Sequence, residues 1–318
     1  MYKISSSITY LSKENTSCLR GLLALAIIFH HFRNIAPFML HSFFGPVITA
    51  LGYLCVGMFF FLSGYGLRVQ GRSYLITFPR NRILPYYCTY ILAVFLYAAF
   101  QRSFPTGKEL FCMLTWYGTN IDFGWYLQAQ LLLYLLFWIV YRKSDGKWCP
   151  LIITGLYILI ARQYLGVQSI FCFPMGIWWC DYKGKIDELL SKYWLRFFAV
   201  LSGSFILLFI ADYFYFSNYS YLPAELIIAP LFSALVIIIL IKVPIQCRIT
   251  RFLGTISGEM YIMQGIGFRI FSGLNNSSFL WLYLICTLAF CIAAGWLLHK
   301  AFSFIYSLFR NNLQTQSV

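Results

Sequence analysis

Long apolar runs alternate with short polar or basic segments along almost the whole chain, and this pattern predicts helices. Ten such runs cover about residues 19–40, 46–67, 83–100, 124–141, 149–165, 170–180, 197–216, 223–241, 252–272 and 279–299. A helix needs about 20 apolar residues to cross the hydrocarbon part of a bilayer. The run at 170–180 is too short for a full crossing, and the polar stretch 101–123 is predicted to be a loop.

The composition fixes the class of protein. Hydrophobic residues make up 60% of the 318 residues, charged residues only 11%, and the mean hydropathy is +0.72. A soluble domain carries about 25% charged residues, so this chain has too few to form a water-soluble surface. We therefore expect an all-α polytopic membrane protein with about ten transmembrane helices. No repeat or low-complexity segment divides it, so residues 1–318 are expected to form a single domain.

The positions of the basic residues predict an orientation in the membrane. When alternate loops are assigned to opposite sides, five of the 24 Lys and Arg residues lie on or near the outer side, and 19 lie on the side of the N-terminus. The five are Arg33, Arg102, Lys108, Arg162 and Arg269. Cytoplasmic loops carry such an excess, so the lead-in 1–17 and the tail 300–318 are expected in the cytoplasm, with the chain in the inner membrane.

Two other features of the composition, the net charge and the cysteines, do not indicate a functional site. The net charge of +14 follows from the cations between the apolar runs, so we do not expect nucleic acid as a partner. The ten cysteines are scattered through apolar runs without a CxxC or a Cys/His cluster, and are interpreted as small buried hydrophobic residues. We therefore predict no metal site. No small-residue cleavage site follows the first run, so it is expected to be a retained signal anchor.

The segment CLRGLLALAIIFHHF, residues 18–32, places two histidines about halfway through the first apolar run. At about 1.5 Å per residue, His31 lies about 16 Å along the helix from Arg20, near the middle of the bilayer. Ionisable residues at that depth are costly and are functional by default. A neutral imidazole is suited to act as a general base, whereas the alternative is a hydrogen-bonded packing residue.

Arginines gather in the connection between the second and third runs, at Arg68, Arg72, Arg80 and Arg82, with Arg20 at the same predicted face. The orientation rule explains any one of them. Together they also fit a phosphate-binding entrance, because guanidinium groups bind phosphate bidentately.

Polar residues also interrupt the ninth run, at Glu259, Tyr261 and Gln264. Gln264 lies at a depth comparable to that of His31. Glu259 requires a partner at its depth: either an arginine of another helix in a structural ion pair, or His31 or a substrate hydroxyl, which it would orient.

Asp122 and the aromatic pair Trp125–Tyr126 lie at the predicted outer end of the fourth run. The aromatic residues fit an interfacial belt and equally fit a sugar-binding wall beside an acid.

These residues, in this order, resemble the pattern of the acyltransferase family 3 membrane proteins, which acylate sugars of surface polysaccharides. Arg20 and His31 are similar to the Arg-x10-His signature of the family, and this spacing favours His31 over His30. FFFLSGYGL at 59–67, RILPY at 82–86, WYL at 125–127 and LGTISGEMYIMQ at 253–264 resemble four further motifs. Gln264 departs from the pattern, because many members have histidine there.

The resemblance implies an O-acyltransferase that uses acetyl-CoA as co-substrate and binds no resident cofactor. Arg20, Arg80 and Arg82, with Arg68 and Arg72 nearby, would hold the phosphates of the donor. His31 would deprotonate a hydroxyl of a surface or exported glycan, alongside polysaccharide-synthesis machinery. The alternatives are a transporter of a glycan or lipid-linked sugar without covalent chemistry, and a structural member of a polysaccharide-synthesis complex.

Overall fold

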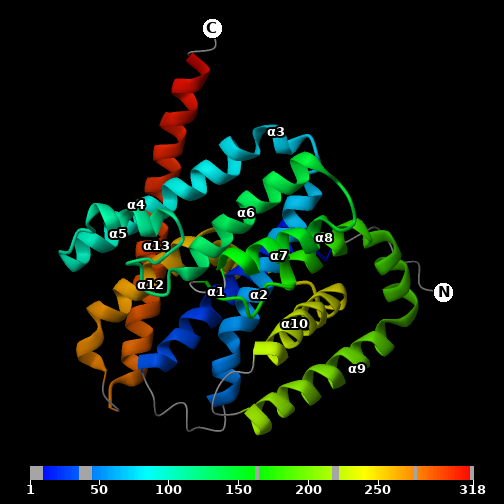
Figure 1. The fold of residues 1–318 in the computed structure, drawn as a ribbon. Coiled ribbons are helices and arrows are strands. Elements are labelled where there is room, and N and C mark those ends of the chain that lie inside the picture. The colour runs from blue at the N-terminus through cyan, green and yellow to red at the C-terminus, as the bar shows by residue number, and fades with distance from the viewer. Residues whose placement is uncertain (1–9, 36–44, 162–164, 217–221, 276–277, 316–318) are drawn as a thin grey trace. The chain divides into compact units, whose positions relative to one another are not determined.

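The computed structural model describes residues 10–35, 45–161, 165–216, 222–275 and 278–315, and every secondary-structure element in these ranges is helical (Figure 1). The elements are α1 Lys13–Ile35, α2 Gly45–Val69, α3 Tyr74–Phe78, the π-helix η2 Pro79–Ile83, α4 Leu84–Gln101, α5 Gly107–Leu114, α6 Trp125–Lys143, α7 Cys149–Ala161, α8 Cys172–Asp181, α9 Lys183–Phe216, α10 Leu222–Lys242, α11 Arg248–Thr255, α12 Ser257–Ile270, the 3-10 turn η3 Ser272–Leu274 and α13 Leu280–Thr315. The all-α prediction is confirmed for these ranges. Parts of the first and fifth predicted runs, 36–40 and 162–164, lie outside them.

The helices differ from the predicted runs in several places, and α13 continues to Thr315, past the predicted end at residue 299. The ninth run is two helices, α11 and α12, because Ile256 between them has φ −108° and ψ 11°. The seventh begins earlier, since α9 starts at Lys183 and bends at Tyr193. The segment 101–123, predicted to be a loop, contains α5.

A capping box starts α5. The Thr106 hydroxyl accepts a hydrogen bond from the Glu109 backbone N–H, and the Glu109 carboxylate accepts one from the Thr106 N–H at 2.8 Å. Two donors at the helix start are thereby satisfied. The hydrogen bonds from the backbone and hydroxyl of Thr106 also lower the pKa of Glu109. The Thr-x-x-Glu pattern is the sequence signal that indicates this short helix.

Five helices of the described chain are long and apolar enough to cross a membrane, by length and composition: Gly45–Val69, Tyr74–Gln101, Lys183–Phe214, Leu222–Lys242 and Leu280–Ile305. They confirm a multi-pass membrane protein, while the ten crossings and the orientation stay predictions. Three helices outside this set, α1, α6 and α12, carry polar residues within apolar sequence, and His31 and Gln264 are among them.

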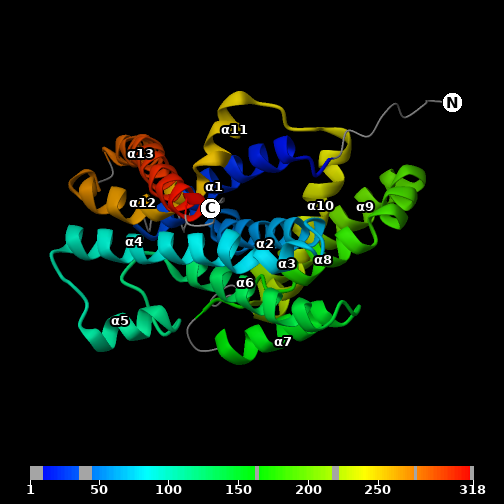
Figure 2. The same ribbon diagram turned by 90° about the horizontal axis from the view of Figure 1, so that it is seen from above.

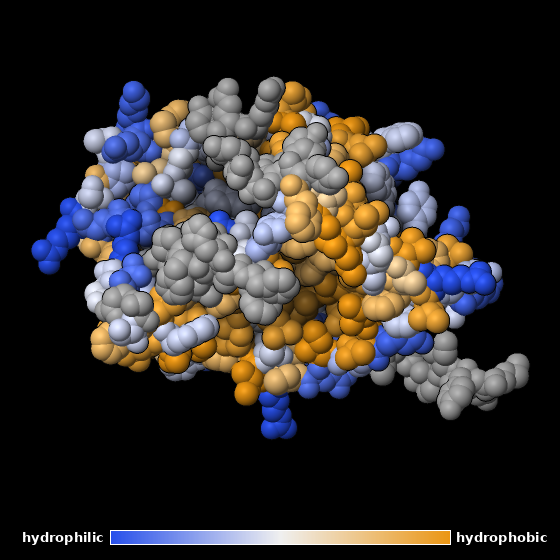
Figure 3. Space-filling model, turned by 90° about the horizontal axis from the view of Figure 1, so that it is seen from below, coloured by the Kyte–Doolittle hydropathy of each residue, from blue (hydrophilic) through white to orange (hydrophobic). Residues whose placement is uncertain are grey.

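The surface agrees with a lipid solvent. Large apolar side chains stand exposed on α9 and α13, Leu207 at 69%, Phe214 at 70% and Trp281 at 63% among them. Figure 3 shows hydrophobic residues over much of one face, with hydrophilic residues projecting at its edges. Because lipid tails solvate apolar groups, such exposure carries no penalty in a bilayer.

The chain divides into two compact units. Unit 1 comprises Met1–His30, Phe43–Val69 and Gln168–Thr255. Within it α2 packs against α8 and α10, and α10 packs against α9 (Figures 1 and 2). Small residues allow the closest approach: a Cβ on Gly176 would lie 2.1 Å from the Phe61 carbonyl oxygen, and one on Gly64 would lie 2.2 Å from that of Phe173.

Unit 2 comprises His31–Ser42, Gln70–Val167 and Ile256–Val318. Within it α12 lies along α13, and α6 contacts α3, η2, α4 and α7. Hydrogen bonds to backbone carbonyls fix α12: Tyr97 of α4 donates to Ile262 at 2.8 Å, and Tyr283 of α13 donates to Phe268 at 2.7 Å. The predicted catalytic histidine belongs to this unit.

Candidate active site

His31 lies in the interior of unit 2 with a defined hydrogen-bond partner. Its side chain is 8% exposed, and its Nδ1 lies 2.9 Å from Oε1 of Gln264, which is fully buried on α12. An amide oxygen only accepts hydrogen bonds, so this contact places the proton on Nδ1. When the ring is neutral, Nε2 is then its basic nitrogen, as a general base requires.

Two aromatic residues fix the plane of the His31 ring. The Phe123 ring stacks on it, with centroids 3.9 Å apart and planes 11° apart, and the Tyr261 ring meets it edge-on at 6.4 Å. The Tyr261 hydroxyl donates to the Phe123 carbonyl. Phe123 has φ +61°, which is uncommon for a residue with a side chain. The Tyr261 hydrogen bond therefore holds Phe123 in a conformation that brings its ring onto His31.

The neighbouring His30 has a different setting. It belongs to unit 1, where its Nδ1 lies 2.9 Å from the Ile48 carbonyl oxygen and its ring packs against Gly52 of α2. A Cβ on Gly52 would lie 2.5 Å from His30 Nε2. These contacts are those of a packing residue between two helices.

Gln264 has one further feature. Its Nε2 is buried and has no hydrogen-bond partner among the residues that the structure describes. An unpaired buried amide donor costs about 1–3 kcal/mol, so a ligand oxygen at this position would recover that free energy. Gln264 thus presents one oxygen to His31 and two N–H donors to whatever binds beside it.

Glu259, one turn before the site on α12, pairs with His299 of α13 at 2.8 Å between Oε1 and Nδ1. The predicted partners of Glu259 were an arginine, His31 or a substrate hydroxyl, and His299 was not among them. The observed pair joins α12 to α13.

Asp122 pairs with Arg269 at the end of α12. The two guanidinium nitrogens, Nε and Nη2, donate to the two carboxylate oxygens at 2.5 and 2.7 Å. This ion pair lies close to the backbone of α12: a Cβ on Gly265 would lie 2.4 Å from the Asp122 Cβ.

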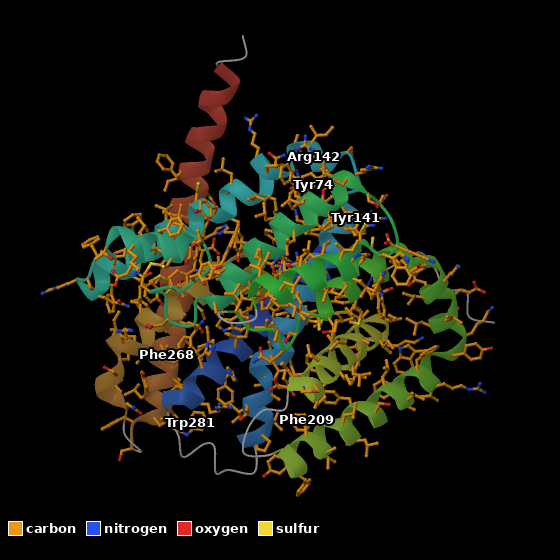
Figure 4. All side chains as sticks on the ribbon, in the orientation of Figure 1. Tyr74, Tyr141, Arg142, Phe209, Phe268 and Trp281 are labelled. Atoms are coloured by element: carbon orange, nitrogen blue, oxygen red, sulfur yellow. The ribbon has the colours of Figure 1, made fainter. Side chains whose placement is uncertain are left out.

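A pocket of about 370 Å³ opens beside this pair. It is lined by Asp122, Phe123, Gly265, Phe268, Arg269, Ser272 and Tyr283, and Figure 4 labels Phe268 on α12. Phe123 thus has His31 against its ring and also lines a pocket with aromatic walls and a charged pair. Trp125, which was predicted together with Asp122 to bind a sugar, contacts Tyr126 edge-on at 6.4 Å between ring centroids.

The five predicted phosphate-binding arginines are divided between the units. Arg20 and Arg68 belong to unit 1. Arg20 is half-buried and its Nε donates to the Thr16 carbonyl at 3.4 Å, and Arg68 forms an ion pair with Asp181. The predicted gathering of all five around one entrance stays a prediction.

The other three arginines belong to unit 2 and lie on or next to α3 and η2. Arg82 Nη2 donates to the Tyr134 hydroxyl at 2.8 Å, and its guanidinium lies 5.0 Å from the centroid of that ring. Arg80 is exposed on η2, and Arg72 lines a second pocket with Trp138 and Arg142.

A protein-family model described as an acyltransferase domain matches residues 15–300, nearly the whole chain. The chain belongs to the acyltransferase 3 family. The resemblance seen in the sequence is thereby confirmed, and the protein is a membrane acyltransferase. Searches of curated proteins and of solved structures returned no significant match.

Three residues of the candidate site were not predicted from the sequence as members of it: Phe123, Arg269 and His299. Phe123 stands between Asp122 and the WYL motif, and no local pattern indicates its positive φ. Arg269 was counted only as a cation on the outer side, although its spacing of four from Gly265 places both on one helix face. The pairing of His299 with Glu259 joins residues 40 apart in the chain.

Proposed function

We propose that this acyltransferase transfers an acetyl group from acetyl-CoA to a hydroxyl of a surface or exported glycan. The observation that carries the proposal is the buried His31, whose Nδ1–H is directed to Gln264 and whose ring lies between Phe123 and Tyr261. This arrangement leaves a base of fixed orientation inside a protein of the acyltransferase family.

The proposed reaction needs one base and one acid. His31 Nε2 takes the proton of the acceptor hydroxyl as the oxygen attacks the thioester carbonyl carbon. A C–O bond forms, the C–S bond breaks, and the leaving CoA sulfur receives the proton from the imidazolium. The products are the acetylated glycan and CoA with a free thiol. Such a base accounts for about 10²–10⁴ of the rate.

The negative charge that develops on the carbonyl oxygen needs a hydrogen-bond donor. Gln264 Nε2 is buried, is adjacent to the Oε1 atom that holds His31, and has no partner among the described residues. We assign it this donor role. Loss of one such donor commonly costs about 10²–10³ in kcat.

The pocket beside Phe123 suits the acceptor. Aromatic walls from Phe268 and Tyr283 pack against the apolar faces of a sugar ring, while the Asp122–Arg269 pair supplies both hydrogen-bond acceptors and donors for its hydroxyls. This assignment favours the acceptor role over the aromatic-belt interpretation of the same segment.

Replacement of His31 tests the proposal. Membranes that contain the protein should transfer labelled acetyl from acetyl-CoA to glycan, and His31→Gln should reduce the rate by about 10²–10⁴. His30→Gln is the matched control, since it removes the same side chain one residue away and should keep most of the transfer.

Two results would contradict the proposal. One is equal loss in both histidine variants at equal protein levels, because the effect would then be one of folding. The other is glycan movement across the membrane without consumption of any acyl-CoA, which would favour a transporter.

A further inference from the structure

One ridge of α6 connects the candidate active site with a second pocket of unit 2. Tyr126, Gln130, Tyr134, Trp138 and Arg142 recur at every fourth residue and form one row that winds around α6, because each step of four residues turns by about 40°. At one end, the Tyr126 ring lies 5.4 Å from the ring of Tyr261, which in turn contacts His31. At the other end, Trp138 and Arg142 line the pocket.

This pocket has a volume of about 450 Å³ and is lined by Arg72, Ser73, Leu75, Ile76, Trp138 and Arg142. Two of these side chains are guanidinium groups, and no carboxylate belongs to the lining that the structure describes. Figure 4 labels Arg142 at the end of α6, which contacts α3. Guanidinium groups bind phosphate oxygens bidentately, so the charge of this pocket favours a phosphorylated ligand.

The sequence explains why the indole of Trp138 faces the pocket in a fixed position. Pro79 has no N–H and so leaves the carbonyl of Leu75, four residues earlier, without its usual helical partner. Trp138 Nε1 donates to that carbonyl at 3.1 Å. The Arg142 guanidinium then lies 5.3 Å from the centroid of the indole ring. The indole ring can therefore stack on a planar base, and the guanidinium can bind a phosphate.

The length of the ridge is comparable to that of the pantetheine arm of acyl-CoA. From Trp138 to Tyr126, the helix rises about 18 Å at about 1.5 Å per residue. The pantetheine arm, from the pyrophosphate to the thioester carbon, contains about 14 bonds and reaches about 16 Å when extended like a peptide chain. Arg82 lies over Tyr134, between the two ends, where it can meet the amides of the arm.

We propose that the pocket lined by Arg72, Trp138 and Arg142 binds the phosphorylated nucleotide end of acyl-CoA, with the pantetheine arm directed along α6 toward Tyr126. This inference rests on the proposed function. It adds Trp138 and Arg142 to the residues that bind the donor. It also assigns different positions to two predicted arginines: Arg72 lines the pocket, whereas Arg82 lies along α6 beside the pantetheine arm.

Binding of adenosine 3′,5′-bisphosphate, the nucleotide end of CoA, tests the pocket without any acyl transfer. Isothermal titration of the purified full-length protein should show binding that Arg142→Gln weakens by about tenfold, as expected for the loss of one charged hydrogen-bonding group. Lys143→Gln is the matched control: Lys143 is the next residue, also exposed, and does not line the pocket. Arg72→Gln, on a different segment, should weaken binding like Arg142→Gln.

Kinetics give a second readout. Arg142→Gln should raise the KM for acetyl-CoA and leave kcat nearly unchanged, because it removes binding common to substrate and transition state. Normal bisphosphate affinity in both arginine variants, with normal acetyl transfer, would overturn the pocket and leave the proposed function standing. Loss of bound anionic lipid in Arg142→Gln, with unchanged bisphosphate affinity, would also overturn it and assign the pocket to a lipid headgroup.

Discussion

At the scale of single residues, adjacent histidines have different surroundings because the helix turns by about 100° between them. His30 is directed to the Ile48 carbonyl, whereas His31 is directed to Gln264. The chemistry of the two side chains is identical. Their roles therefore depend on which helix each one faces.

Gln264 should be needed both for charge stabilisation and for the orientation of the base. We expect Gln264→Leu to reduce kcat by about 10²–10³. Gln264→Glu should retain the hydrogen bond to Nδ1–H but place a negative charge beside His31, which favours the protonated imidazole. The acidic limb of the pH profile of kcat/KM should then move to higher pH, and rate measurements from pH 5 to 9 would detect it.

Gln128 provides a control for this prediction. Its amide nitrogen donates hydrogen bonds to the Tyr90 hydroxyl and to the carbonyls of Met113 and Gly118, so Gln128 joins α4, α5 and α6 structurally. Gln128→Leu should lower the free energy of unfolding by about 1–3 kcal/mol without moving the pH profile. A pH profile of Gln264→Glu that matches the wild type would contradict the contact with His31.

The Asp122–Arg269 pair should affect the acceptor more than the donor. Both side chains are partly exposed, so the pair contributes only about 0–1 kcal/mol to stability. We expect Asp122→Asn and Arg269→Gln each to raise the KM for the glycan about tenfold, as for loss of a charged hydrogen bond, with the KM for acetyl-CoA unchanged. Steady-state kinetics with each substrate varied in turn would test this. A change confined to the KM for acetyl-CoA would be the contrary result.

At the scale of helices, close packing depends on glycines at the contact between α2 and α8. Gly64 and Gly176 bring each backbone against a carbonyl of the other helix. The hydrophobic pattern alone indicates that both helices are buried, but the small residues decide how near they come. Single residues therefore set the distance between the two helix axes.

Gly176→Ala should destabilise the protein by about 1–3 kcal/mol, because its Cβ would overlap the Phe61 carbonyl and the backbone must shift. Gly203 in α9 is the control, since a Cβ there meets no atom within 4 Å. Gly203→Ala should be neutral or stabilising by up to about 1 kcal/mol, from helix propensity. Thermal unfolding of the detergent-solubilised protein compares them, and equal Tm values would contradict the close contact.

At the scale of the whole molecule, the distribution of cations is the argument for orientation. The 19 Lys and Arg residues on the N-terminal side form clusters between apolar runs, as expected for loops that remain in the cytoplasm. Five helices satisfy the length and composition needed for a crossing. Under the prediction of ten crossings, the others would be made by shorter or more polar helices, α1, α6 and α12 among them, whose polar groups would pack against other helices and not against lipid.

Reporter fusions test the ten crossings. Alkaline phosphatase is active only outside the cytoplasm, so a fusion after Val318 should be inactive, and one after Ser272, between the ninth and tenth predicted runs, should be active. Green fluorescent protein should give the reverse pattern. An active phosphatase at the C-terminus would mean an odd number of crossings or the opposite orientation.

Much of the fold follows from the sequence, because helix position depends on local properties. Apolar length places most of the helices to within a few residues, and α2 and α10 agree almost at both ends. The exceptions also have local causes, such as the capping box of α5. The motif spacing likewise selected His31 and the acyltransferase family, since a spacing on one helix is a property of the chain alone.

The contacts of the site were decided only by the tertiary structure. The hydrogen bond between His31 and Gln264 joins residues 233 apart, and the ion pair between Asp122 and Arg269 joins residues 147 apart. Hydropathy and periodicity report how a segment meets its solvent and its own next turn. They carry no information on which distant side chain fills the space opposite, because that depends on how several helices pack at once.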